Sequence, residues 1–393
     1  MSRELREQAK SRSSFVKVGD RRGYRLVADW GHVTLLEGGC HFCELSSNKH
    51  GGMSPLWRPP WTTIDPHTYN PVQYQTKYGG PPDGRLLAGI TGHNLSFDYF
   101  GPPSKEETAA GLSTHGEASW RKWKLSAAQQ GRSPSLDCCV ELSDAQIQLR
   151  RIITLEQHQP VVYCEETATS LTNFDRPISW AEHVTFGPPF LEPGVSAFDM
   201  SATRAKVCPA AYGSRLGLRP DAEFRWPYAP TMKARVDLRR TAGNVHGRYT
   251  AQLMDSRIKI AWVAASNAHL GLLVLYLFQR SDFPWVGNWE ERFYRKNTPW
   301  EGKTFCRGIE FSTTPFPVPR RESVTRGRLF GQATYRWLPA RSAQRVRYLI
   351  LLLDIPKDFL GVAQVFWRKG NIEVIGRSTS LRTIPCQVRD FLC

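Results

Sequence analysis

The stretch VVYCEETATSLTN, residues 161–173, mixes β-branched and aromatic residues with polar ones in a pattern that changes face residue by residue. Because successive side chains of a β-strand point to opposite faces, this pattern indicates a strand in a sheet with one wet surface. The stretch YLILLLDI, residues 348–355, is apolar on both faces, which predicts a strand in the middle of a sandwich. Together the two stretches favour a layered β protein.

Similar strand patterns recur along the chain, whereas helical periodicity is scarce. Short helices are expected at residues 1–12 and 104–112. No low-complexity linker and no exact repeat divides the sequence, so we predict one large antiparallel β domain over residues 21–393, preceded by a polar N-terminal extension, residues 1–20. Further strands are expected within residues 32–39, 148–157, 258–266, 270–278 and 363–376.

The chain is strongly basic, since its 52 lysines and arginines exceed its 36 aspartates and glutamates and give a formal net charge of +16. Such a charge favours anionic partners, including nucleic acids and phosphorylated or acidic sugars. The arginines are scattered through aromatic segments such as RRESVTRGRLFGQATYRW, residues 320–337, and no nucleic-acid recognition motif accompanies them. We therefore expect no nucleic-acid partner.

The longest apolar stretch, LGLLVLYLF at residues 270–278, is about half the length that a transmembrane helix needs. The first residues, MSRELREQAKSRSSF, lack the apolar region of a secretory signal. The nine cysteines show no repeated C-x-x-C pairing and no second ligand cluster near Cys40, His41 and Cys43. These features predict a cytoplasmic protein with reduced cysteines, no metal site and no membrane partner.

Four short segments combine titratable residues with glycine or proline, and they lie far apart in the sequence. Glycine lets the backbone approach a ligand closely, and proline fixes the corner that aims a neighbouring side chain. Because the pattern is repeated, we predict that the fold gathers these segments at one pocket. The residues are His93 and Asn94 in GITGHNLSFDYFGPP, His115 and Glu117 in THGEASW, Glu182 and His183 in AEHVTFGPPF, and Arg307 and Glu310 in RGIEFSTTPFP.

Each of these residues also has a purely structural interpretation. A lone histidine on a strand is more often a buried, hydrogen-bonded residue than a catalytic one. A glutamate followed by phenylalanine, as at Glu310, is typical of the solvated face of an alternating strand. Alternation also sends Glu182 to the face opposite His183, so these two neighbours are not expected to act as direct partners.

A histidine and a glutamate that face one another supply an acid and a base near neutral pH without special tuning. One carbohydrate reaction suits this pair directly: a base takes the proton of the anomeric hydroxyl while an acid protonates the ring oxygen, and the ring opens to the aldehyde. Rotation about the C1–C2 bond and reclosure then give the other anomer. The reaction requires no metal and no cofactor, and we expect none.

Three segments in this order, THGEA (residues 114–118), EHVTFGPPFLEPG (182–194) and RGIEFSTTPFP (307–317), resemble the aldose 1-epimerase (galactose mutarotase) superfamily, especially its divergent bacterial branch. The resemblance extends over residues 25–385 in overall layout. It implies an all-β fold, the β-supersandwich, in which large twisted antiparallel sheets with few short helices carry a sugar cleft on a concave face.

The resemblance also implies roles for individual residues. By motif position, His183 is the general acid at the ring oxygen, Glu310 is the general base at the anomeric hydroxyl, and His115 binds the sugar. Well-studied members carry an arginine ahead of the His-Gly strand; here His93 and Asn94 stand at the comparable place, and we expect them to replace that sugar contact.

Residue type suggests three further sugar contacts. Trp226 and Trp289 offer apolar walls to the C–H faces of a sugar, although a place in the core explains both equally well. Arg307, three residues before Glu310, is suited to an anionic substituent, although a solvated strand position is the default for an arginine. An aspartate that recognises a sugar hydroxyl in well-studied members has no clear counterpart here.

The sequence thus predicts a carbohydrate-active protein, an aldose 1-epimerase-like enzyme that interconverts the anomers of a hexose or hexose derivative. The basic charge suggests a phosphorylated or acidic sugar, and the oligomeric state is left open. A non-catalytic sugar-binding module on the same fold is the alternative. A glycoside hydrolase or lyase is a third interpretation, and a hydrolase would need Glu117 or Glu182 as a second carboxylate facing Glu310.

Overall fold

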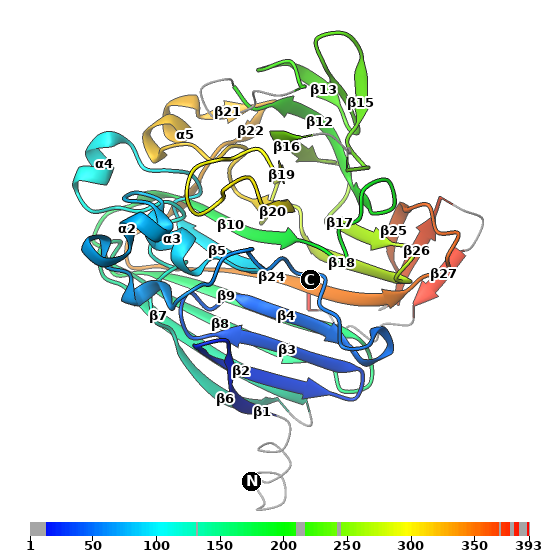
Figure 1. Ribbon diagram of the computed structural model, residues 1–393, viewed down its shortest axis with the longest axis horizontal. Coiled ribbons are helices and arrows are strands. Elements are labelled where there is room, and N and C mark those ends of the chain that lie inside the picture. Colours follow the sequence, from blue (N-terminus) through cyan, green and yellow to red (C-terminus); the bar gives the residue numbers. More distant parts are fainter. Residues whose placement is uncertain are drawn as a thin grey trace, which may run out of the picture.

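The computed structural model describes residues 13–130, 133–209, 217–241, 245–368, 371–377, 381–384 and 391–392. Two antiparallel sheets make up most of it, and they pack face to face (Figure 1). This confirms the predicted all-β class. No helix in these ranges is long and apolar enough to cross a membrane.

The larger sheet runs from the N-terminal strands through the middle of the chain and back. Its order is β1-β2-β3-β4-β5-β10-β20-β19-β16-β12-β13, and β23 pairs with the first part of β10. The strands are β1 (Ser13–Val18), β2 (Arg21–Ala28), β3 (Gly31–Leu36), β4 (Phe42–Ser47), β5 (His93–Asp98), β10 (Arg176–Phe186), β20 (Phe305–Ser312), β19 (Trp285–Arg292), β16 (His246–Met254), β12 (Ala202–Val207), β13 (Glu223–Arg225) and β23 (Arg336–Leu338).

The smaller sheet has the order β11-β17-β18-β24-β9-β8-β7-β6. Its strands are β11 (Ala197–Met200), β17 (Ile260–Asn267), β18 (Leu272–Gln279), β24 (Ala343–Asp354), β9 (Val161–Ser170), β8 (Ile147–Leu155), β7 (Ser133–Leu142) and β6 (Lys124–Gln130). Small additional sheets are formed by β14 (Tyr228–Pro230) with β15 (Arg235–Asp237), by β21 (Arg328–Leu329) with β22 (Gln332–Ala333), and by β25 (Val362–Arg368), β26 (Asn371–Gly376) and β27 (Leu381–Ile384).

Helices are short and lie in the connections. They are α2 (Pro71–Tyr78), α3 (Gly84–Gly89), α4 (Lys105–Ala109) and α5 (Arg320–Arg326), with 3-10 turns η1 (Asn48–His50) and η2 (Pro66–Thr68). The helix expected within residues 104–112 is confirmed: Ser104 and Glu107 form a capping box at the start of α4. The helix expected at residues 1–12 lies outside the described residues.

Strand β1 falls inside the segment that was expected to be a polar extension. It pairs with β2 at the edge of the larger sheet, from Ser13 opposite Leu26 to Val18 opposite Arg21. The expected boundary at residue 20 therefore comes after the first strand of the sheet. The sequence does not predict this strand, because short polar strands at a sheet edge carry little hydrophobic signal.

The two strand patterns that favour a sandwich have the expected burial. In β9, fully buried residues alternate with half-buried ones from Val162 onward. In β24, Ile350 and Leu352 belong to the core between the two sheets, whereas Leu349 and Leu351 pack with residues of β25 and β26 against the other face. The apolar character of both faces of β24 is explained by this third layer.

Candidate active site

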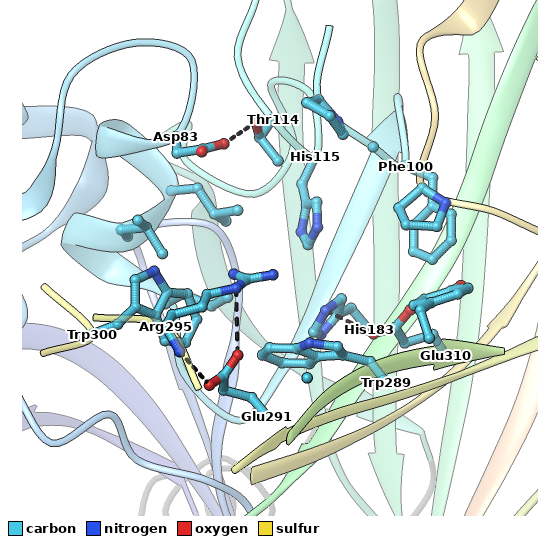
Figure 2. Close-up of a pocket in the computed structure, with 18 of the residues that line it drawn as sticks. Asp83, Phe100, Thr114, His115, His183, Trp289, Glu291, Arg295, Trp300 and Glu310 are labelled. Carbon is cyan, nitrogen blue, oxygen red and sulfur yellow. Dashed lines mark hydrogen bonds and ion pairs between the residues drawn. The ribbon is translucent and has the colours of Figure 1, made fainter. Parts of the chain in front are cut away.

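A cavity of about 490 Å³ lies on the outer face of the larger sheet, meaning the face turned away from the smaller sheet. Its floor is formed by β10, β16, β19 and β20, and its walls by α3 and by the loops that follow β5, α4, β19 and β20 (Figure 2). The lining side chains that carry the chemistry are Asp83, His115, His183, Arg248, Tyr249, Trp289, Glu291, Arg295, Trp300 and Glu310.

His183 and Glu310 lie side by side on this floor. They are direct partners in the register of β10 and β20, so strand pairing alone puts them on the same face of the sheet. His183 Nε2 lies 3.0 Å from Glu310 Oε1, and 6% and 2% of the two side chains are exposed. The structure thus brings together, at one cavity, the two residues for which the sequence suggests acid and base roles.

The other ring nitrogen of His183 is also fixed. Thr185, two residues along β10 and therefore on the same face, places its Oγ1 3.0 Å from His183 Nδ1. When the ring carries a proton on both nitrogens, Nδ1–H donates to the Thr185 hydroxyl oxygen; when only Nε2 carries a hydrogen, the hydroxyl donates to Nδ1. The imidazole is thereby held in one orientation toward the cavity.

His115 lies above this pair in the cavity wall (Figure 2). Its ring centroid is 4.9 Å from that of His183, and Phe100 stacks on it with centroids 6.2 Å apart. Its backbone has φ 64°, and it is followed by Gly116 at φ 69°, where a β-carbon would lie 2.2 Å from the Phe97 carbonyl oxygen. Burial, together with nearby His183, lowers the pKa of His115 well below its usual value, so the ring is neutral at pH 7.

Aromatic rings form part of the cavity lining. The ring centroids of Trp289 and His183 are 5.7 Å apart, and Trp300 meets Trp289 at 6.1 Å, nearly edge to face. The Arg295 guanidinium lies over Trp300, 4.6 Å from its ring centroid. Trp289 thus occupies the wall position for which the sequence suggests a sugar contact.

Several lining residues were not identified from the sequence. Glu291 accepts hydrogen bonds from the backbone amides of Tyr294 at 2.8 Å and Arg295 at 3.0 Å, and burial raises the pKa of its carboxyl group. Asp83 accepts a hydrogen bond from Thr114. The aromatic density of the segment between residues 281 and 305, which the sequence shows, is the signal that could have led to Trp300, Glu291 and Arg295.

His93 does not face the cavity, which corrects its expected role as a sugar contact. It begins β5 and points to the inner face, where its Nε2 lies 2.8 Å from Glu182 Oε2 and both side chains are fully buried. Burial, together with nearby Arg151, lowers the pKa of His93 well below its usual value. Asn94 is the register partner of His183, but it is fully buried and does not line the cavity.

Arg307 and Trp226 are also separated from the cavity. Arg307 lies on the inner face, fully buried, and donates to Asn288 Oδ1 at 2.9 Å and to the carbonyl oxygen of Leu238. Trp226 follows β13 in the chain, and its side chain packs against two core clusters. The suggested anion contact and the second apolar wall are therefore not formed by these residues, because strand alternation and the position of β13 at the sheet edge carry them elsewhere.

The two carboxylates named for a hydrolase are likewise not in the cavity. Glu182 points inward, as alternation predicts, and Glu117 pairs with Arg121 outside the cavity lining. Glu291 shares the cavity with Glu310, but its register partner is Cys306, four residues from Glu310 along β20. Four residues correspond to roughly 13 Å between the two backbone positions, so strand pairing does not make Glu291 an immediate neighbour of Glu310 as it does His183.

The cysteines that the structure describes are free thiols: Cys40, Cys43, Cys138, Cys139, Cys164, Cys208 and Cys306. Among the described residues no group of three or more His, Cys, Asp or Glu side chains is placed to hold a metal ion.

Comparison with known proteins gives matches in structure. No protein-family model matches the sequence, and no curated protein matches it. A solved structure from Klebsiella pneumoniae, which carries a provisional aldose 1-epimerase name, aligns with a TM-score of 0.63 over 87% of this chain and 83% of its own, at 13% identity.

Two further solved structures agree. A galactose mutarotase-like protein from Clostridium acetobutylicum aligns with a TM-score of 0.53 over 87% of this chain and 98% of its own, at 12% identity. A galactose mutarotase related enzyme from Lactobacillus acidophilus aligns with a TM-score of 0.52 over 85% and 98%, at 11% identity. The chain therefore has the β-sandwich fold of the aldose 1-epimerase and galactose mutarotase-like proteins, in a sequence far diverged from theirs.

Proposed function

We propose that this protein is an aldose 1-epimerase-like enzyme that interconverts the anomers of a hexose or hexose derivative. The observation that carries the proposal is the contact of His183 with Glu310, 3.0 Å apart on the floor of a cavity with aromatic walls. The anomeric oxygen and the ring oxygen of a sugar are bonded to the same carbon. An acid and a base that are immediate neighbours on two strands are therefore suitably spaced to serve both oxygens at once.

In the proposed reaction, the Glu310 carboxylate takes the proton from the hydroxyl on C1, and the electron pair of that O–H bond forms the carbonyl π bond. The C1–O5 bond breaks, and its electron pair takes the Nε2 proton of a His183 ring that carries a proton on both nitrogens, so that the ring becomes a neutral imidazole. After rotation about C1–C2, His183 recovers the proton from the O5 hydroxyl, O5 attacks C1, and Glu310 returns its proton to O1. The residues finish in their starting states, so no other reactant is consumed.

The lining supports a neutral sugar better than an anionic one. Its charged side chains include the acids Asp83, Glu291 and Glu310 beside Arg248 and Arg295, and Arg295 is already engaged by Glu291. The net charge of +16 is therefore not concentrated at the cavity. We propose a neutral hexose as substrate, with Trp289 against its C–H faces.

Replacement of Glu310 by Gln tests the proposal. The amide keeps the shape of the side chain but cannot take a proton, so we expect the rate of anomer interconversion to fall by about 10²–10⁴-fold. Polarimetry on freshly dissolved α-glucose and α-galactose measures the rate, and saturation-transfer NMR measures sugar binding, which should persist. Binding of sugar by the unaltered protein without acceleration would instead identify a non-catalytic binding module.

A further inference from the structure

The hydroxyl of Tyr249 is a buried polar group at the cavity that the acid–base pair does not use. Tyr249 is 5% exposed and lines the cavity, yet its hydroxyl oxygen has no hydrogen-bond partner among the described residues. An unpaired buried hydroxyl lowers the stability of a protein. A phenylalanine would avoid this cost, so the hydroxyl requires an explanation.

Its position supplies one. Gly287 of β19 is the register partner of Glu310, and Tyr249 of β16 pairs with Trp289, two residues further along β19. A β-carbon built on Gly287 would lie 2.0 Å from the Tyr249 hydroxyl oxygen and 2.8 Å from Glu310 Oε2. Both oxygens therefore occupy the space that this glycine leaves open, within a few ångströms of each other.

The two oxygens of the Glu310 carboxylate consequently have different neighbours. Oε1 faces His183 Nε2 from β10, whereas Oε2 faces the Tyr249 hydroxyl from β16. Burial, together with the carboxylate of Glu310, raises the pKa of Tyr249 well above its usual value, and burial does the same for Cys306 on the strand of Glu310 itself. Tyr249 thus keeps its proton and can only donate toward the carboxylate.

We infer that Tyr249 is a positioning residue for Glu310: its hydroxyl donates to Oε2, fixes the rotation of the carboxylate toward the sugar and favours the ionised form. A hydrogen bond to a carboxylate stabilises its charged state, which is the state that a base must have before it takes a proton. Such bonds are often long without substrate and shorten once it is bound. The inference rests on the proposed function, because it needs Glu310 to act as a base.

The test compares Tyr249→Phe with Tyr276→Phe. Tyr276 is a matched control, since its buried hydroxyl also has no partner among the described residues but lies in the core between the sheets. Anomer interconversion of α-glucose and α-galactose is measured by polarimetry from about pH 5 to about pH 9. For Tyr249→Phe we expect kcat to fall about tenfold with KM little changed, and the acidic limb of the kcat/KM profile to move up by about one pH unit.

Tyr276→Phe should keep or slightly increase the free energy of unfolding in urea, because it loses an unpaired buried hydroxyl. Tyr249→Phe should lower it modestly, because it loses the hydrogen bond to Glu310. Tyr276→Phe should leave kcat and the pH profile unchanged. Suppose that the unaltered protein accelerates interconversion and that Tyr249→Phe has the same kcat and the same acidic limb. This result would overturn the role of Tyr249 but leave the proposed function standing. If the unaltered protein gives no acceleration, the proposed function and this inference both fail.

Discussion

Two histidine–glutamate pairs join strand β10 to its neighbours on opposite faces of the larger sheet. On the inner face, His93 Nε2 lies 2.8 Å from Glu182 Oε2, and neither side chain is exposed. On the outer face, His183 Nε2 lies 3.0 Å from Glu310 Oε1 and both side chains line the cavity. The residue types match and the distances are nearly equal, so the surroundings must decide what each pair can do.

The inner pair is part of a closed ionic network. Glu182 Oε2 also accepts a hydrogen bond from Arg151 at 3.2 Å, and Arg151 pairs with Glu166 Oε1 at 2.6 Å. Burial raises the pKa of Glu166 to about 8. The outer pair instead faces the cavity of about 490 Å³. The comparison teaches that a histidine beside a glutamate does not by itself indicate a site. The outer pair is the candidate because it faces a cavity, whereas the inner pair faces further buried partners.

The largest expected effect is a difference in stability between variants of the two glutamates, Glu182 and Glu310. Replacing Glu182 by Ala leaves Arg151 partly unpaired in the core, and we expect the free energy of unfolding to fall by about 3–5 kcal/mol. Replacing Glu310 by Ala, which leaves no buried guanidinium unpaired, should cost less than about 1.5 kcal/mol. Urea unfolding followed by circular dichroism measures both. Equal losses in the two variants would contradict the division between a structural and a functional face.

Strand alternation, read from the sequence, accounts for part of this division. It correctly sends Glu182 to the face opposite His183. The same rule applies to Arg307 and Glu310, which are three residues apart on one strand and so cannot share a face. His93 and Asn94 are adjacent, so at most one of them could point to the outer face. Alternation thus limits which residues share a face, but it cannot say which face has the cavity.

The rest of the site depends on strand pairing between distant segments. Tyr249 and Trp289 meet because β16 pairs with β19, and Glu310 meets Gly287 because β19 pairs with β20. Such registers are set by packing over the whole sheet rather than by local pattern. For this reason the sequence points to His183 and Glu310, the proposed acid–base pair, which lie in recognisable motifs, and misses Tyr249, whose segment carries no motif.

The stability of the protein at acidic pH should depend on His93, the histidine of the inner face. The pKa of His93 in the folded protein is lowered well below the unfolded value of 6.5, so its contribution to stability is present above pH 6.5 and is lost as the pH falls. We expect this residue alone to reduce the free energy of unfolding by about 1.4 kcal/mol for each pH unit below that value. Urea unfolding of the unaltered protein and of His93→Gln at several acidic pH values isolates the contribution. If the free energy of unfolding falls equally steeply with pH in both proteins, the His93 ring takes up its proton in the folded protein as readily as in the unfolded one, and the prediction is wrong.

The smallest expected effect concerns the wall of the cavity. Trp289, whose ring centroid is 5.7 Å from that of His183, is well placed to cover a C–H face of the sugar. Replacing it by Phe keeps an aromatic ring but shortens the wall, and we expect KM to rise about fivefold, the equivalent of about 1 kcal/mol of aromatic contact, with kcat nearly unchanged. Trp226→Phe is the matched control, because Trp226 packs outside the cavity and should leave KM as it is. Steady-state polarimetry at several sugar concentrations separates KM from kcat. A KM that rises equally in both variants would point to a general loosening of the fold. An unchanged KM in Trp289→Phe would contradict the prediction and would mean that the polar residues of the floor bind the sugar without this ring.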